Sequence, residues 1–168
     1  MKMNSTPPII IYRHRKENLK KCSLQGLEKN ESYFFYTYPK EPLPINIENP
    51  IVLDISAKTI LSSADHVKGL ILIDATWRYA DKMMNTLPSS YERRSLPKGW
   101  QTAYPRKQTQ CPNPKEGLAS IEALYIALKI MKRDVSQLLN DYYWKKKFLM
   151  NNKLKFTEFD DIINYSII

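Results

Sequence analysis

The sequence predicts a single α/β domain in which a mainly parallel sheet is flanked by helices. Short aliphatic runs alternate along the chain with segments of helical spacing, which is the pattern of parallel strands connected by helices. A length of 168 residues suits one domain with its own hydrophobic core. A content of 43% hydrophobic and 26% charged residues is typical of a globular protein.

The first half of the chain predicts three strands, at Pro8–Arg13, Tyr33–Tyr38 and Ile51–Ile55, because these short runs are rich in β-branched or aromatic residues. The basic and polar segment 14–31 predicts a loop that enters a short helix. Four prolines in 39–50 predict an irregular connector. Residues 62–65 predict the capped start of another short helix.

The second half begins with the aliphatic run 70–73, which predicts a buried strand, followed by a helix from Trp77 to about Leu87 that Pro88 ends. We expect a basic loop over 93–97, a strand over 101–104 and a long irregular loop over 105–117. Ser120 is a candidate cap for the clearest helix, in which Ile121, Leu124 and Leu128 follow helical spacing. Further helices are expected over 135–150 and 156–168.

The aliphatic run ends abruptly in Asp74, and Trp77 follows within a turn. A buried parallel strand that ends in a charge delivers that charge to the carboxyl edge of the sheet, where ligands bind in open α/β folds. An acid and an indole at this edge suit a cationic or nucleotide-like ligand. The alternative is that Asp74 caps the next helix and that Trp77 fills the core.

Charge and composition narrow the class of partner. The chain has 26 Lys and Arg against 17 Asp and Glu, a net charge of +9, which favours a polyanion such as nucleic acid over a merely soluble basic protein. No apolar run reaches membrane-spanning length, and the N-terminal apolar patch is too short for a signal peptide, so we expect a cytoplasmic protein with no membrane partner. Two cysteines and two histidines, all far apart, form no metal-binding spacing, so no metal is expected.

Several motifs together resemble known families. The run Asp74-Ala75-Thr76-Trp77-Arg78-Tyr79-Ala80 resembles the signature of DTW-domain proteins, and Arg94-Ser95-Leu96-Pro97, Tyr104-Pro105-Arg106 and the segment 117–124 resemble the elements that follow it. Lys20-Lys21-Cys22-Ser23 and Leu61-Ser62-Ser63-Ala64-Asp65 are similar to elements of the sister family, the small-subunit rRNA aminocarboxypropyltransferases. The resemblance covers residues 8–135 and depends on the order and spacing of the motifs.

The resemblance implies a function and a fold. Both families transfer the 3-amino-3-carboxypropyl group of S-adenosylmethionine to N3 of a uridine or pseudouridine, on a fold related to the SPOUT methyltransferases with a trefoil knot. It implies a cofactor-binding core over 51–135, between an N-terminal part (1–50) and C-terminal helices (136–168). The segment around Tyr104 is closer to the DTW pattern, whose known members modify tRNA. We therefore expect tRNA ahead of rRNA, and a monomer.

The resemblance and the chemistry of the transfer suggest roles for individual residues. Asp74 is the candidate base for the N3 proton, or else it orients the ammonium of the cofactor or caps a helix. Trp77, Leu53 and Ile55 are expected to enclose the methyl group, with a cation–π contact between the indole and the sulfonium. Ser23 and Ser120 are candidates for the amino acid end, although Ser120 can equally be an ordinary cap. Glu122 is a candidate for a ribose hydroxyl or the ammonium, or a first-turn acid that the helix dipole favours. Ile73 and Leu118 complete the cofactor-binding set.

Basic and aromatic residues flank these motifs and are candidates for RNA contacts. They are Arg78, Lys82, Arg93, Arg94, Tyr104, Arg106 and Lys107. Each alone is typical of a solvated surface, but as a group around Asp74 they favour RNA binding. Two other functions remain open on the same residues, an RNA methyltransferase and a non-catalytic RNA-binding module.

Overall fold

The computed structural model describes residues 6–105 and 117–165, with side chains described as far as residue 160. A five-stranded sheet forms its centre, in the order β2-β1-β4-β3-β5. The strands are β1 (Ile9–His14), β2 (Tyr33–Tyr38), β3 (Ile51–Leu53), β4 (Leu70–Asp74) and β5 (Glu92–Arg94). Every neighbouring pair is parallel, which confirms the predicted fold class.

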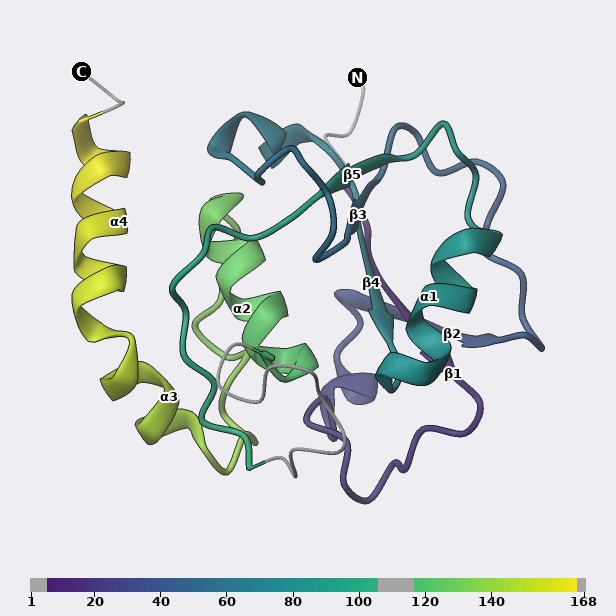
Figure 1. Ribbon diagram of the computed structural model, residues 1–168, viewed down its shortest axis with the longest axis horizontal. Helices are drawn as coiled ribbons and strands as arrows, with labels where there is room; N and C mark the ends of the chain where they lie inside the picture. Colours follow the sequence, from purple (N-terminus) through teal and green to yellow (C-terminus); the bar gives the residue numbers. More distant parts are fainter. Residues whose placement is uncertain (1–5, 106–116, 166–168) are drawn as a thin grey trace.

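Helices cover both faces of this sheet (Figure 1). The helix α1 (Trp77–Thr86) lies on one side, and α2 (Ser120–Ile130) lies on the other. The helices α3 (Lys145–Asn151) and α4 (Lys153–Tyr165) stand outside α2, and the short 3₁₀ turns η1 (Leu27–Lys29) and η2 (Ser63–Val67) complete the elements. Within the described part of the chain, no helix is both long and apolar enough to cross a bilayer.

The alternation of side chains along the strands divides the core in two. Ile9, Ile11, Leu70 and Leu72 pack on the side of α2, in a cluster that extends to Phe148 of α3. The residues between them, such as Ile10 and Ile71, face the other side and pack with Met83 of α1. The two faces of a strand are one residue apart, so each strand end also presents consecutive residues to opposite faces.

Three predicted elements are wrong. Arg93 and Arg94, expected in the basic loop over 93–97, instead lie in the edge strand β5 beside β3. Residues 101–104 are not in a strand, because polar side chains take their backbone N–H groups. The helix expected over 135–150 begins only at Lys145, after a series of turns.

Candidate functional site

The carboxyl ends of β1 and β4 carry a buried charged cluster. Arg13 and Asp74 are register partners in the two strands, so their side chains emerge side by side on the α2 face. The Nε of Arg13 donates to Oδ2 of Asp74 at 2.8 Å, and Nη1 of Arg13 donates to Oε1 of Glu28 at 2.8 Å. Asp74 is only 2% exposed, so this ion pair is screened from solvent far less than a surface pair would be.

The first residue of α2 joins this cluster. Ser120 Oγ donates to Oδ1 of Asp74 at 2.9 Å, while Ala119 occupies the cap position of the helix. Ser120 is therefore the first helical residue, and its hydroxyl contacts the strand end instead of capping the helix. The carboxylate of Asp74 is likewise engaged by Arg13 and Ser120, and the helix after it is capped at Thr76 without a side-chain hydrogen bond. This geometry ties the start of α2 to the end of β4.

The charges of the cluster favour an ionised arginine. Burial alone would lower the pKa of the Arg13 guanidinium, but the hydrogen bonds to Asp74 and Glu28 outweigh it and raise the pKa above its ordinary value. One cation thus faces two carboxylates at the sheet edge. Sequence reasoning missed Arg13 and Glu28 as members of this site.

Cys22 completes the cluster as a buried thiol. Its Sγ lies 3.4 Å from Oδ2 of Asp74 and 3.5 Å from Nη2 of Arg13. Burial, and then the charge of Asp74, raise the pKa of the Cys22 thiol to about 12. The nucleophilic thiolate is therefore suppressed at neutral pH.

We expect Cys22 to resist alkylation in the native protein. A Cys111→Ser background isolates its signal, and iodoacetamide at pH 8 should modify the folded protein far more slowly than the same protein in denaturant, since only unfolding exposes and ionises the thiol. Mass spectrometry of time points measures both rates. Equal rates in the folded and denatured protein would contradict the burial and the raised pKa.

Glu17, Cys22 and Asp74 place their ligand-type atoms within 4.8 Å of one another, a spacing that suits a metal ion. The guanidinium of Arg13 already occupies Oδ2 of Asp74 and approaches the sulfur. A cation at this point would meet that positive charge directly. This group of side chains therefore suits an ion pair with Arg13 better than a bound metal ion.

Glu122 lies behind the cluster in the first turn of α2 and is fully buried. Its carboxylate accepts from Thr102 Oγ1 (2.7 Å), Ala103 N (2.8 Å), Ala119 N (2.9 Å) and the hydroxyl of Tyr142 (2.9 Å). These bonds fasten the irregular segment 101–104 to the start of α2. The side chain proposed for a ribose or an ammonium is thus engaged within the protein itself.

The remaining cofactor candidates lie in different places. Ser23 Oγ accepts from the backbone N–H of Ile121 at 3.2 Å, so it stands at the same helix start as Ser120. Leu53 and Leu118 pack at the margin of the α2-side core, whereas Ile73 packs on the α1 side. Ile55 is 71% exposed beyond the end of β3. Trp77 is half-buried as the first residue of α1.

Among the described residues, the predicted RNA-binding side chains are either held by internal partners or exposed. Arg93 donates to Asp54 and to the carbonyl of Met84, both at 3.2 Å, and Arg94 is paired with Asp65 and Glu92, so both guanidiniums are held internally. Arg78 and Lys82 are exposed on α1. The hydroxyl of Tyr104 donates to the carbonyl of Lys21 at 2.8 Å. Arg106 and Lys107 lie outside the described residues.

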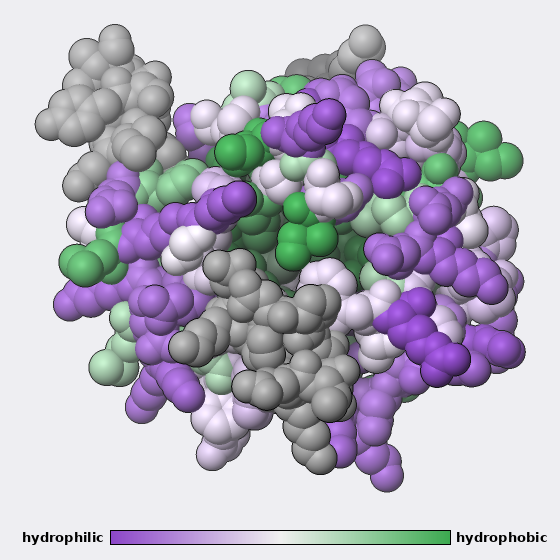
Figure 2. All heavy atoms as spheres, in the orientation of Figure 1, coloured by the Kyte–Doolittle hydropathy of each residue, from purple (hydrophilic) through white to green (hydrophobic). Residues whose placement is uncertain are grey.

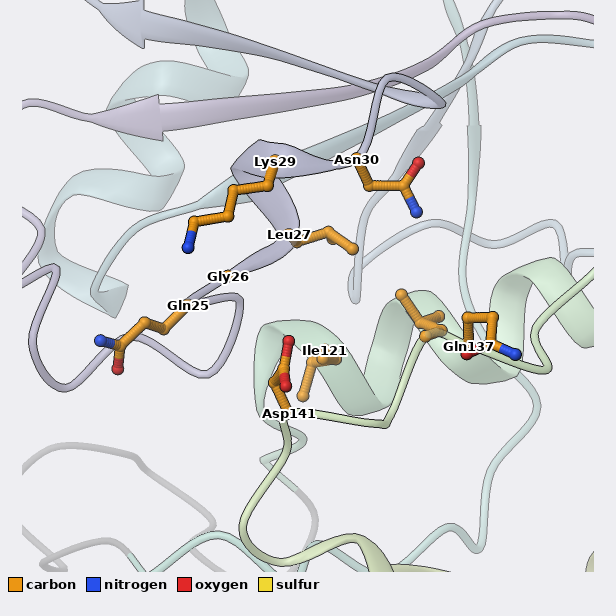
Figure 3. A pocket seen from close by; sticks show the side chains of 9 residues that line it. Gln25, Gly26, Leu27, Lys29, Asn30, Ile121, Gln137 and Asp141 are labelled. Atoms are coloured by element: carbon orange, nitrogen blue, oxygen red, sulfur yellow. The ribbon is translucent and has the colours of Figure 1, made fainter.

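A pocket of about 390 Å³ opens beside this site, between η1 and the start of α2 (Figure 3). Leu27, Ile121 and Leu138 give it an apolar wall, and Gln25 and Asp141 are among its polar lining. Ile121 is the residue whose N–H Ser23 holds, so the pocket and the charged cluster share the helix start. Figure 2 shows a further concentration of apolar side chains in the middle of the face drawn there, surrounded by hydrophilic ones.

A parallel α/β sheet with an ion-paired acid at its carboxyl edge defines the chain as an α/β protein with an edge site. The family model of the DTW domain matches residues 2–150, and the chain belongs to this family. It also resembles the solved structure of the SAM-dependent rRNA:acp-transferase Tsr3 from Vulcanisaeta distributa, with a TM-score of 0.71 and 26% identity over 90% of this chain and 81% of that one. A comparison with curated proteins gives no match.

Proposed function

We propose that this protein transfers the 3-amino-3-carboxypropyl group of S-adenosylmethionine to N3 of a uridine in RNA. The observation that carries the proposal is the Asp74 cluster, because the acid of the DTW motif lies at the carboxyl edge of the sheet, against the start of α2, and this edge is where open α/β folds bind ligands. Membership of the DTW family and the similarity to Tsr3, an rRNA:acp-transferase that depends on SAM, support the same reaction and the same donor. The trefoil knot, a monomeric state and a cytoplasmic location stay predictions.

The site offers groups for two polar parts of the donor, the sulfonium and the carboxylate. S-adenosylmethionine combines a sulfonium, an ammonium and a carboxylate, and when bound it supplies an electrophilic carbon next to the sulfonium. We propose that the indole of Trp77 faces the sulfonium, a contact of about 0.5–2 kcal/mol. The N-terminal turn of α2, with Ser120 and Ser23, suits the carboxylate. Leu53 and Leu118, at the margin of the α2-side core, are the proposed apolar surroundings, whereas the exposed Ile55 and the α1-side Ile73 lie apart from them.

In the proposed transfer, the bond between N3 and the propyl carbon forms while the bond between that carbon and sulfur breaks. The electron pair leaves on sulfur as methylthioadenosine, and the N3 proton goes to a base. Asp74 is the proposed acceptor of this proton. Arg13 and Ser120 hold the carboxylate in place, which favours an orienting role in addition to proton transfer.

The RNA partner is open between two classes. The sequence around Tyr104 resembles the DTW pattern of tRNA-modifying proteins, and the solved relative acts on rRNA. Small-subunit rRNA is at least as well supported as tRNA. Among the basic candidates, we propose that Arg78 and Lys82 contact phosphates, because Arg93 and Arg94 are held in internal pairs.

Incorporation of label identifies both the reaction and the substrate. We expect carboxyl-labelled S-adenosylmethionine to label unmodified tRNA or small-subunit rRNA fragments, with methylthioadenosine as the co-product, since the carboxyl carbon travels with the transferred group. Scintillation counting of each purified RNA distinguishes the two classes.

Two outcomes would contradict the proposal. Label from the methyl group, with S-adenosylhomocysteine as co-product, would show an RNA methyltransferase. RNA binding without any binding of S-adenosylmethionine would show a non-catalytic module.

A further inference from the structure

A second cluster occupies the same sheet edge on the opposite face. His14 is the residue after Arg13 in β1, so its side chain faces α1 while that of Arg13 faces α2. The residues around it, which we call the basic cluster, combine two rings with four exposed cations. They are His14, Tyr79, Arg15, Lys16, Arg78 and Lys82.

Two rings form the base of this cluster. The imidazole of His14 stacks on Tyr79, with ring centroids 4.1 Å apart and planes within 5° of parallel. Lys16 Nζ lies 3.5 Å from the Tyr79 hydroxyl and 5.5 Å from the ring centroid. Arg78 Cζ lies 5.8 Å from the same ring. The end of β1 and the first turns of α1 thus bring their cations to one point.

The cations of the basic cluster have no carboxylate partner among residues 6–105 and 117–160. Arg13, Arg93 and Arg94, in contrast, are each paired with at least one acid. Cations held close together without counter-charge repel one another, and a bound anion relieves that repulsion. Figure 2 shows the side of the molecule around α1 covered by hydrophilic side chains.

His14 supplies a neutral donor within this positive field. The backbone N–H of Lys16 donates to Nδ1 of His14 at 3.2 Å, so the neutral ring carries its proton on Nε2. Burial lowers the pKa of His14, and the charges of Lys16, Arg15 and Lys82 lower it further. Tyr38 of β2 and Tyr79 of α1 are the other titratable groups in contact with the ring.

We propose that the basic cluster binds a phosphodiester of the RNA substrate, with Lys16, Arg78 and Lys82 as its cations and Nε2–H of His14 as a neutral donor. The inference rests on the proposed RNA substrate and adds a position for the sugar–phosphate backbone of that RNA. The phosphate lies on the α1 face of the edge, and the target base reaches around the ends of β1 and β4 to Asp74 on the α2 face. Phosphate chemistry is shared with free nucleotides and inorganic phosphate, so the test includes them.

The test compares two charge-matched double variants. Lys16→Ala/Lys82→Ala removes two cations from the basic cluster, and Lys146→Ala/Lys153→Ala removes two exposed cations from α3 and α4. Affinity for a fluorescent RNA that the wild type labels, or for unmodified tRNA if none is labelled, is measured by anisotropy from 50 to 300 mM salt. We expect the first variant to bind about tenfold more weakly at 0.1 M salt and to lower the slope of log K against log salt by about 1.5, with the control near wild type.

A second readout uses pH. Because the pKa of His14 is lowered and its ring acts as a neutral donor, wild-type affinity should stay nearly constant between pH 8 and pH 7, and His14→Gln, which keeps an N–H donor, should weaken binding less than His14→Ala. Thermal denaturation checks that each variant is folded. Equal losses in both double variants, or no loss in either, would overturn the proposal.

Separate arms distinguish the ligand source and the proposed function. Inorganic phosphate or uridine monophosphate that binds with the same sensitivity to Lys16→Ala/Lys82→Ala, while RNA affinity is unchanged, would overturn the proposal in favour of a nucleotide site. Loss of RNA affinity in Lys16→Ala/Lys82→Ala, when the wild type transfers no label, would keep the basic cluster and reject the transferase. Label transfer by Lys16→Ala/Lys82→Ala with an unchanged KM for RNA would keep the transferase and reject the phosphate-binding role of the basic cluster.

Discussion

Asp74→Asn is expected to abolish most of the transfer while the protein still folds and binds S-adenosylmethionine. The amide keeps the size of the side chain but can neither take the N3 proton nor pair with the charge of Arg13. Loss of a general base lowers rates by about 10²- to 10⁴-fold, and we expect a fall in kcat within that range. Single-turnover assays with labelled donor measure the rate, and calorimetry measures donor binding.

Ser120→Ala is the matched control, because it removes one donor to Asp74 and leaves the charge. It should cost much less activity than Asp74→Asn, about tenfold if the hydroxyl mainly orients the carboxylate. Near-normal turnover by Asp74→Asn would remove Asp74 from the mechanism.

Glu122→Ala should cause the largest loss of stability among the substitutions considered. It removes the acceptor of four hydrogen bonds and leaves buried donors on Thr102, Ala103, Ala119 and Tyr142 without it. Each abandoned buried donor costs about 1–3 kcal/mol, so a loss of about 3–5 kcal/mol is expected for the network after partial rescue by water. Urea denaturation followed by fluorescence gives the free energy of unfolding.

Tyr142→Phe is the control for this network, since it deletes one donor and leaves the carboxylate bonded to three others. We expect it to cost about 1 kcal/mol. If Glu122→Ala were no more destabilising than Tyr142→Phe, the carboxylate would not be the fastening point of the segment 101–104. Its role would then be sought in ligand binding, as first expected from its place in the helix.

Most of the sheet could be predicted because its strands are marked by local runs of aliphatic or aromatic residues. Tyr33–Tyr38 is observed with the predicted bounds, and the strand that ends at Asp74 follows from its aliphatic run. In contrast, β5 consists of Glu92, Arg93 and Arg94 at the edge of the sheet, where pairing with β3 needs no apolar period. A three-residue charged edge strand has no signal in sequence, since only its neighbour defines it.

The prediction of a helix over 135–150 was wrong for a different reason. Val135, Leu138 and Tyr142 follow helical spacing, and Leu138 and Tyr142 are buried, but successive turns bury them instead of a helix. Lys132, with φ of 55°, has already redirected the chain in a left-handed conformation. The spacing of these side chains is helical, but the backbone buries Leu138 and Tyr142 through turns.

The candidate site was predictable in part. Asp74 and Ser120 were named from the strand end and the helix start, and the structure brings them within hydrogen-bond distance. Arg13 carries the same signal as Asp74, an aliphatic run that ends in a charge, so it could have been found by the same argument. Glu28 and Cys22 could not be found in this way, because only the loop after β1 brings them to the ion pair of Arg13 and Asp74.

The strict alternation of β1 makes its two last residues inseparable. Arg13 belongs to the acid-bearing side and His14 to the cationic side, and nothing but the pleat of one strand assigns them. Insertion or deletion of one residue in this strand would exchange the two side chains and spoil both surfaces at once. Point substitutions can alter either surface alone, so β1 is free to diverge in residue type while its length stays under constraint.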